Sequence, residues 1–232
     1  MPRQFRLPLT EPPCWDRESF ASSPTNLEAL EGLDAWPAWP DGRMALVGPA
    51  GTGKSHLARD WAARTGAVTI EAASTGNAPL DLAALRGRPL LVEDADRRSE
   101  GDLVDDETLF HLINMAGVDG GSLLLTGRLA PVAWEAAVPD LRSRLNALTV
   151  ARVMEPDDIV LEAVLRRAFE AAGIRPAGDL YPYLMARLPR SAAEVLAAVA
   201  ALDEASIEQG REVNKALALS VLDFGGDDDG ED

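Results

Sequence analysis

Short runs of apolar residues alternate with amphipathic segments through the first part of the chain. A strand covered on both faces is apolar at consecutive positions, and parallel strands need a crossover connection, which is usually a helix. The alternation therefore predicts an α/β fold in which a parallel sheet carries helices on both faces. The expected strands cover residues 44–47, 67–72, 88–94, 122–127 and 147–153, and the expected helices between them cover 54–65, 80–85 and about 105–116.

The pattern changes after the fifth expected strand, where apolar residues recur at helical spacing. Leu161, Leu165 and Ala168 would lie on one stripe of a helix. Ser191 and Glu194 have the spacing of a capping box, which marks the start of another helix. The expected helices run from Pro156 to Gly173, over about 177–188, from Ser191 to about Gly210, and from about Asn214 to Leu222.

These patterns divide the chain into four parts. The N-terminal residues are rich in proline and show no period, which is typical of an extended arm, and the acidic, glycine-rich C-terminus is typical of a disordered tail. Thr25 and Glu28 also have capping-box spacing and predict a short helix that ends near Gly32. The expected parts are an arm over 1–22, an α/β domain over 23–153, a small all-helical domain over 154–222 and a tail over 223–232.

The chain is acidic, with 38 aspartates and glutamates against 22 lysines and arginines and a net charge of −16. This charge opposes a general attraction to nucleic acid or to an anionic membrane, so we expect neither sequence-specific DNA binding nor membrane binding. The single cysteine, Cys14, excludes an internal disulfide and fits a reducing compartment. The N-terminus lacks the apolar core of a signal peptide, and we therefore expect a cytoplasmic protein.

One motif has a direct chemical meaning. Residues 48–55 read G-P-A-G-T-G-K-S, which fits the phosphate-binding pattern G-x-x-x-x-G-K-[ST], and they lie between an expected strand and an expected helix. Backbone N–H groups of such a loop surround phosphate, Lys54 can reach the β- and γ-phosphates, and Ser55 can hold Mg²⁺. We assign to a site for ADP or ATP the residues Gly48, Pro49, Ala50, Gly51, Thr52, Gly53, Lys54 and Ser55, with the following His56.

A phosphate-binding loop needs an acidic partner for Mg²⁺ at the end of a neighbouring strand. Glu93 and Asp94 end the third expected strand and supply it together with Ser55. In one register Glu93 holds the metal through water and Asp94 polarises the attacking water; in the other, Asp94 is the metal partner and Ala95 occupies the catalytic position. Either register predicts weak hydrolysis by this chain. The alternative is a pair of solvated acids at a strand end.

Other polar residues lie at positions that could contribute to a nucleotide site. Thr126 ends the fourth expected strand and could orient water, although a threonine in an ordinary turn is nearly as consistent with the sequence. The segment 139–145 carries arginines that could enter a neighbouring subunit's site or form surface ion pairs. Arg190 precedes a helix start and could reach a phosphate or remain solvated.

The N-terminal arm contains a short candidate docking peptide. Apolar anchors beside an amide, on a segment stiffened by proline, are how short peptides bind grooves on other proteins. The alternative is a tail that folds back on its own domain. The residues concerned are Gln4, Phe5, Leu7, Pro8 and Leu9.

Together these motifs resemble the AAA+ ATPases, and in detail the replication-initiator group that contains DnaA. The resemblance extends from residue 23 to about 222 and implies a five-stranded parallel sheet with a small helical lid. The matching segments are Ser23–Leu27 for the stretch that contacts adenine, Leu124–Thr126 for sensor 1, Leu141–Arg144 for box VII, and Leu188–Arg190 for sensor 2.

The resemblance implies roles for single residues. Asn26 would contribute to the adenine site, Arg190 with Lys54 would hold the chain's own nucleotide, and Arg144 would be an arginine finger that acts on another subunit. Two departures put self-hydrolysis in doubt without affecting a role in trans. The Glu93-Asp94 pair differs from the usual Asp-Asp pair, and Arg128 replaces an acid that often follows sensor 1.

The arm and the lack of a helix-turn-helix segment after the lid are similar to the DnaA-related regulators rather than to DnaA itself. Such a regulator, with bound ADP and attached to the DNA-loaded β sliding clamp, promotes ATP hydrolysis by DnaA and prevents re-initiation at the bacterial replisome. The rival interpretations are a stand-alone ATPase motor or helicase loader, and a passive clamp-binding adaptor with a structural nucleotide. The sequence leaves a monomer and a homo-oligomer equally open.

Overall fold

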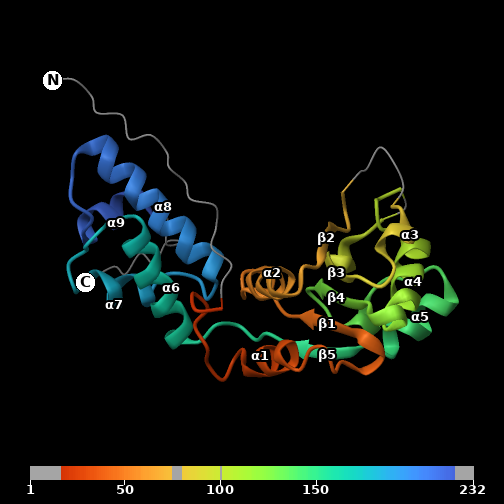
Figure 1. Cartoon of the computed structure of the whole chain (residues 1–232). Helices are drawn as coiled ribbons and strands as arrows, with labels where there is room; N and C mark the ends of the chain where they lie inside the picture. Colours follow the sequence, from red (N-terminus) through yellow and green to blue (C-terminus); the bar gives the residue numbers. More distant parts are fainter. Residues whose placement is uncertain (1–16, 75–79, 100, 223–232) are drawn as a thin grey trace.

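The computed structural model describes residues 17–74, 80–99 and 101–222. Figure 1 shows two groups of elements in this part of the chain, a sheet with helices on both sides and a separate group of four helices, α6 to α9. Across the described residues, no helix is both long and apolar enough to cross a membrane.

The sheet has five parallel strands in the order β2-β3-β4-β1-β5. Every residue of β4 and β1, two of the three inner strands, is buried, which explains their apolar runs. This sheet confirms the fold class expected from the sequence. The strands are β1 (Arg43–Val47), β2 (Val68–Glu71), β3 (Pro89–Glu93), β4 (Ser122–Gly127) and β5 (Thr149–Arg152).

Successive residues of each inner strand enter different layers of the core. In β1, Ala45 and Val47 pack with α3, α4 and α5, whereas Met44 and Leu46 pack with α1 and α2 on the opposite face. This alternation follows from the two-residue period of a strand. The helices are α1 (Leu27–Asp34), α2 (Lys54–Thr65), α3 (Leu82–Leu85), α4 (Asp106–Met115) and α5 (Pro139–Asn146).

The four remaining helices have an apolar core of their own, which includes Leu165, Phe169, Leu180, Leu202 and Leu217. Side chains that accept hydrogen bonds from backbone N–H groups begin three of these helices. The helices are α6 (Asp158–Ala171), α7 (Leu180–Met185), α8 (Ala192–Gln209) and α9 (Lys215–Val221), and the three capping residues are Asp157, Ser191 and Asn214.

Three local expectations were wrong. Helix α1 begins at Leu27 without a side-chain cap, because the hydroxyl of Thr25 pairs with that of Ser23 at 2.7 Å. Helix α6 begins at Asp158 rather than at the preceding proline, since Asp157 caps it. Helix α5 was not expected at all. Its segment is mostly polar, and only an apolar pair at helical spacing, Leu141 and Leu145, is buried against the sheet.

Candidate functional site

The carboxyl ends of the strands meet at one edge of the sheet, where the loop of residues 48–53 joins β1 to α2. Gly48 and Gly53 are two of the loop positions that need glycine. A Cβ on Gly48, which has φ +155°, would lie 2.1 Å from the backbone oxygen of Val153. A Cβ on Gly53, which has φ +92°, would lie 2.9 Å from the ring of Phe20. The packing around the loop therefore requires glycine at these two positions, as the motif predicted.

Lys54 lies inside this loop. Its side chain is buried, and its Nζ donates a hydrogen bond to the Pro49 carbonyl at 2.6 Å. Burial lowers the pKa of the Lys54 ammonium, whereas the carboxylates of Asp94 and Asp96 act to raise it and the charge of Arg128 lowers it further. The charge of Lys54 thus interacts with carboxylates of the segment that follows β3.

The start of α2 suits an anion. No side chain of the described residues caps this helix terminus, so its first N–H groups face the loop without a side-chain acceptor. Such a terminus favours phosphate through its N–H groups and its dipole. The exposed Ser55 hydroxyl lies beside Lys54 in the first turn. Lys54, Ser55 and the loop N–H groups therefore fit a nucleotide phosphate with Mg²⁺.

The two candidate acids at the end of β3 have different surroundings. The Glu93 side chain is only 8% exposed and forms an ion pair with Arg59 of α2, whose Nη2 lies 2.6 Å from Oε2. Asp94 is half-buried, has φ +51°, and acts on the charge of Lys54. The structure therefore turns Glu93 toward α2 and leaves Asp94 beside the loop.

A cavity of about 290 Å³ lies at the carboxyl ends of β2 and β3. It brings Ser55 of the loop together with both acids, Glu93 and Asp94, which the sequence analysis assigned to one site. The remaining lining residues are Arg59, Glu71, Ala72, Ala73 and Ser74.

Thr126 is buried at the end of β4, and its hydroxyl accepts a hydrogen bond from the backbone N–H of Asp94 at 2.9 Å. The following turn is held from the other side, because the Asp96 carboxylate accepts a hydrogen bond from the Arg128 N–H at 2.6 Å. These two contacts couple the ends of β3 and β4. Asp96 belongs to no motif in the sequence, and only its position two residues after Asp94 could have indicated a role at this site.

The segment before α1 packs against the phosphate-binding loop. Both polar groups of the buried Asn26 side chain hold this segment, since it accepts from Ser23 N at 3.0 Å and donates to Ala21 O at 2.9 Å. Further along, the Phe20 ring lies 5.4 Å from the ring of His56, centre to centre. Phe20 is therefore a second residue that the sequence analysis missed, and no motif marks it.

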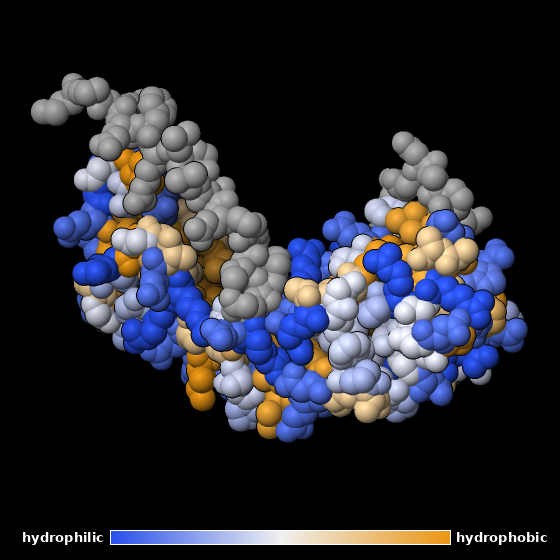
Figure 2. All heavy atoms as spheres, in the orientation of Figure 1, coloured by the Kyte–Doolittle hydropathy of each residue, from blue (hydrophilic) through white to orange (hydrophobic). Residues whose placement is uncertain are grey.

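The start of α8 contacts the same loop. Ala192 N–H donates to the Gly51 carbonyl at 2.9 Å, and a Cβ on Gly51 would lie 2.1 Å from the Ser191 hydroxyl oxygen. Arg190, one residue earlier, pairs with Asp158 at 2.8 Å and donates to the Pro156 carbonyl. Figure 2 shows a hollow between the two groups of elements, with hydrophilic and neutral residues along its floor.

The arginines of α5 differ in their surroundings. Arg142 donates to the backbone carbonyls of Trp134 at 2.6 Å and Val132 at 3.2 Å, so it joins α5 to the preceding turn. Arg144 is exposed, and across the described parts of the chain its guanidinium forms no ion pair or hydrogen bond. Figure 1 shows α5 on the opposite side of the sheet from α2. Arg144 thus lies on a helix that covers the opposite face of the sheet from the helix that begins with Lys54.

The candidate docking peptide Gln4–Leu9 lies outside the described residues, as do Cys14 and the acidic tail 223–232.

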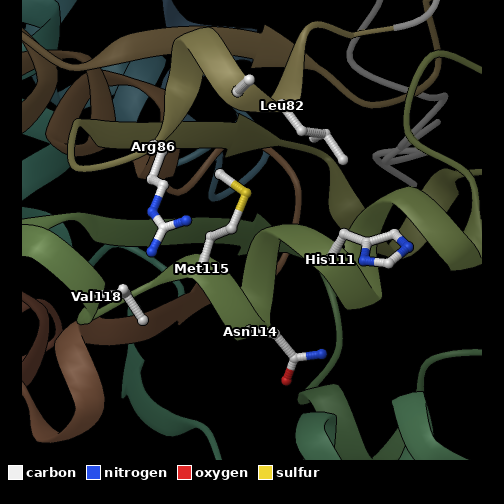
Figure 3. Close-up of a pocket in the computed structure, with 7 residues that line it drawn as sticks. Leu82, Arg86, His111, Asn114, Met115 and Val118 are labelled. Carbon is white, nitrogen blue, oxygen red and sulfur yellow. The ribbon is translucent and has the colours of Figure 1, made fainter.

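A second hollow, of about 450 Å³, lies between α3 and α4 (Figure 3). Its residues Leu82, Met115 and Val118 are apolar, and its charged member Arg86 is paired with Asp119 at 2.7 Å. None of the residues that the sequence assigned to a site lies here, so this hollow is separate from the candidate site.

Comparison of the sequence with protein-family models and with curated proteins finds no match. Solved structures do share the fold. Domain III of the Thermotoga maritima replication initiation protein DnaA is similar with a TM-score of 0.73 and 18% identity, over 90% of this chain and 95% of that chain. DnaA bound to AMPPCP and single-stranded DNA is similar with a TM-score of 0.66 and 17% identity, over 84% of this chain and 68% of that chain.

The Thermotoga maritima RuvB Holliday junction branch migration motor is similar with a TM-score of 0.66 and 16% identity, over 89% of this chain and 70% of that chain. At these identities the likeness concerns the fold. The parallel sheet, the phosphate-binding loop after β1 and these likenesses together show that the chain has the fold of the AAA+ P-loop NTPases.

Proposed function

We propose that this chain binds ADP or ATP with Mg²⁺ at the loop after β1. Lys54 and the N–H groups of α2 hold the phosphates, and Ser55 and Asp94 hold the metal. Mg²⁺, when bound, neutralises part of the phosphate charge. Asn26, His56 and the lid arginine Arg190 complete the nucleotide site in this proposal. Support comes from the glycine-dependent loop and from the DnaA structure that holds AMPPCP in the same fold.

We further propose that the chain is a negative regulator of bacterial replication initiation of the DnaA-related type called Hda. In this role Arg144 enters the nucleotide site of ATP-bound DnaA and stabilises the charge that develops during phosphoryl transfer. The observation that carries the proposal is the contrast between two residues. Arg144 is exposed and unpaired across the described chain, whereas Glu93, a candidate acid for the chain's own turnover, is paired with Arg59.

The partners in this scheme are the β sliding clamp and DnaA. The arm residues Gln4–Leu9 dock on the DNA-loaded clamp through apolar anchors and an amide. Attachment to the clamp raises the local concentration of the regulator near newly replicated DNA. The protein therefore acts in the cytoplasm at the replisome, without reading a DNA sequence itself, as its net charge of −16 suggests.

A hydrolysis assay with ATP-loaded DnaA, clamp loaded on DNA, and this protein tests the proposal. Each component is left out in turn, and phosphate release is followed with time. The proposal predicts acceleration only when all components are present. Accelerated DnaA hydrolysis in the absence of clamp would contradict the docking role. No acceleration by a nucleotide-bound form of this protein would contradict the regulatory role.

A second candidate function is a stand-alone ATPase motor, because RuvB, whose structure is named a branch migration motor, has a similar fold. A motor turns over its own ATP, so multiple-turnover hydrolysis by this chain alone would favour it. A passive adaptor would bind the clamp and nucleotide but leave DnaA hydrolysis unchanged. The same omission assay therefore distinguishes all three candidates.

A further inference from the structure

The ion pair between α2 and β3 has the geometry of a two-point contact. Arg59 Nη2 donates to Glu93 Oε2 at 2.6 Å, and Arg59 Nε lies 3.1 Å from Oε2 and 3.3 Å from Oε1. The guanidinium thus contacts both carboxylate oxygens. Such a contact fixes the rotamer of the carboxylate and is stronger than a single hydrogen bond between neutral groups.

The two members of this ion pair differ in burial. The Glu93 side chain is 8% exposed, whereas that of Arg59 is 37% exposed, so the carboxylate is the member that depends on the pair for compensation. Glu71 of β2 stands beside Glu93 in the strand register and also acts on the charge of Arg59. Arg59 therefore supplies a charged partner to a buried carboxylate that stands next to another acid.

The pair lies on the wall of the cavity that also contains Ser55 and Asp94. Open space thus connects Glu93 to the residues that would hold the metal. What separates Glu93 from this group is the direction of its side chain, toward α2, which the contact with Arg59 holds.

We infer that Arg59 is a positioning residue that withholds Glu93 from the metal site and so keeps hydrolysis of the chain's own nucleotide slow. The inference rests on the proposed nucleotide site but does not depend on DnaA or the clamp. It gives the regulator a means of keeping its nucleotide while it acts on another protein. Without Arg59, the Glu93 carboxylate would turn through the cavity toward Ser55 and join Asp94 at the metal.

The test uses the full chain with Arg59→Gln, and the probes are fluorescent ADP and ATP with and without MgCl₂. Affinity without Mg²⁺ should stay near that of the wild type, because Lys54 and the loop are unchanged. The gain in affinity on adding Mg²⁺ should rise by about tenfold, the size of one charge-assisted contact to the metal's ligand shell. Single-turnover hydrolysis should rise in parallel.

Two further variants identify the cause of any gain. Adding Glu93→Gln to Arg59→Gln should abolish the gain, since the carboxylate that would reach the metal is gone. Arg64→Gln is the matched control. Arg64 lies on the same helix and pairs with Asp60 at 2.9 Å, away from the cavity, so its loss should leave the Mg²⁺ dependence unchanged.

An unchanged Mg²⁺ dependence in folded Arg59→Gln, or a gain that survives loss of Glu93, would overturn the inference. If Arg59→Gln fails to fold, Arg59→Lys serves instead, because an ammonium keeps the charge but not the two-point contact, and a smaller gain is expected. Again, no gain in that folded variant would overturn the inference. A wild-type protein that binds no nucleotide would contradict the proposed site and this role of Arg59 with it, whereas an unchanged Mg²⁺ dependence in a nucleotide-binding variant would contradict the role of Arg59 alone.

Discussion

Alanine substitution of Arg142 and Arg144 should separate a stability role from a role in trans on a single helix. The two residues share α5 but differ in their contacts, since Arg142 donates to two backbone carbonyls and Arg144 is exposed. Arg142→Ala leaves the carbonyls of Trp134 and Val132 without this donor. Arg144→Ala removes a side chain that has no ion pair among the described residues. Each variant is therefore the control for the other.

The expected magnitudes follow from these contacts. Hydrogen bonds to charged groups contribute about 1.5–3 kcal/mol each in buried settings. Because Arg142 is only partly buried, we expect its loss to cost about 2 kcal/mol of unfolding free energy in total. This corresponds to a fall of about 5 °C in the Tm of a domain of this size. Loss of Arg144 should change the unfolding free energy by less than about 0.5 kcal/mol.

Stimulation of DnaA hydrolysis should respond in the opposite way, with a large loss for Arg144→Ala and a small one for Arg142→Ala. An arginine finger is worth about a thousandfold or more in the rate of phosphoryl transfer, so Arg144→Ala should return DnaA hydrolysis to its unstimulated rate. Arg142→Ala should retain stimulation per folded molecule. Urea unfolding followed by tryptophan fluorescence measures the free energy of unfolding, and phosphate release from DnaA measures the stimulation of its hydrolysis. Full stimulation by Arg144→Ala, or a large loss of its stability, would contradict the role of Arg144 in trans.

Three further substitutions test other parts of the account. Gly48→Ala places a Cβ 2.1 Å from the Val153 backbone oxygen. The substitution should therefore lower the free energy of unfolding by about 3 kcal/mol and abolish binding of fluorescent ADP. Wild-type affinity for ADP in this variant would contradict the loop geometry. A backbone hydrogen bond lowers the pKa of Asp105, the cap of α4, so its contribution of about 1 kcal/mol is present above the unfolded-state pKa. That contribution is lost as pH falls below about 4, so the urea midpoints of wild type and Asp105→Ala should converge in acid, and a constant gap would contradict this role. Substituting Gln4 and Leu7 together should abolish clamp binding in a pull-down without changing the Tm, and persistent binding would move the docking site elsewhere.

The sheet and the phosphate-binding loop could be predicted because their signals are local. The inner strands are buried on both faces, so their residues are apolar at every position from Leu123 to Leu125. The loop needs glycine where the backbone has positive φ, as at Gly51 and Gly53, and the motif records that need directly. In such segments the sequence pattern and the structure reflect the same physical constraint.

Other features depend on contacts between distant segments. Helix α5 forms in a polar segment because Leu141 and Leu145 are buried by the sheet, and that burial is not visible in its own sequence. The Thr25 hydroxyl was expected to cap a helix, but the neighbouring Ser23 competes for it. The ion pair of Arg59 joins residues 34 positions apart and depends on how α2 packs on β3.

The candidate site also combines residues that a local motif identifies with an arrangement that depends on contacts between distant segments. The sequence identified Glu93 and Asp94 as a pair but left two registers open. Their different environments, with Glu93 against Arg59 and Asp94 beside Lys54, come from the packing of α2 rather than from the order of the two residues. Phe20, which lies against Gly53, belongs to no motif and could be found only in the folded chain.

In the proposed function, this chain holds its own nucleotide and acts on that of another protein. The most direct measurement loads DnaA with γ-labelled ATP and this chain with unlabelled ADP, then follows labelled phosphate after mixing with clamp on DNA. If the proposed function is right, labelled phosphate release accelerates while this chain stays bound to ADP, and Arg144→Ala abolishes the acceleration. Acceleration that occurs only when this chain itself carries labelled ATP would contradict the account.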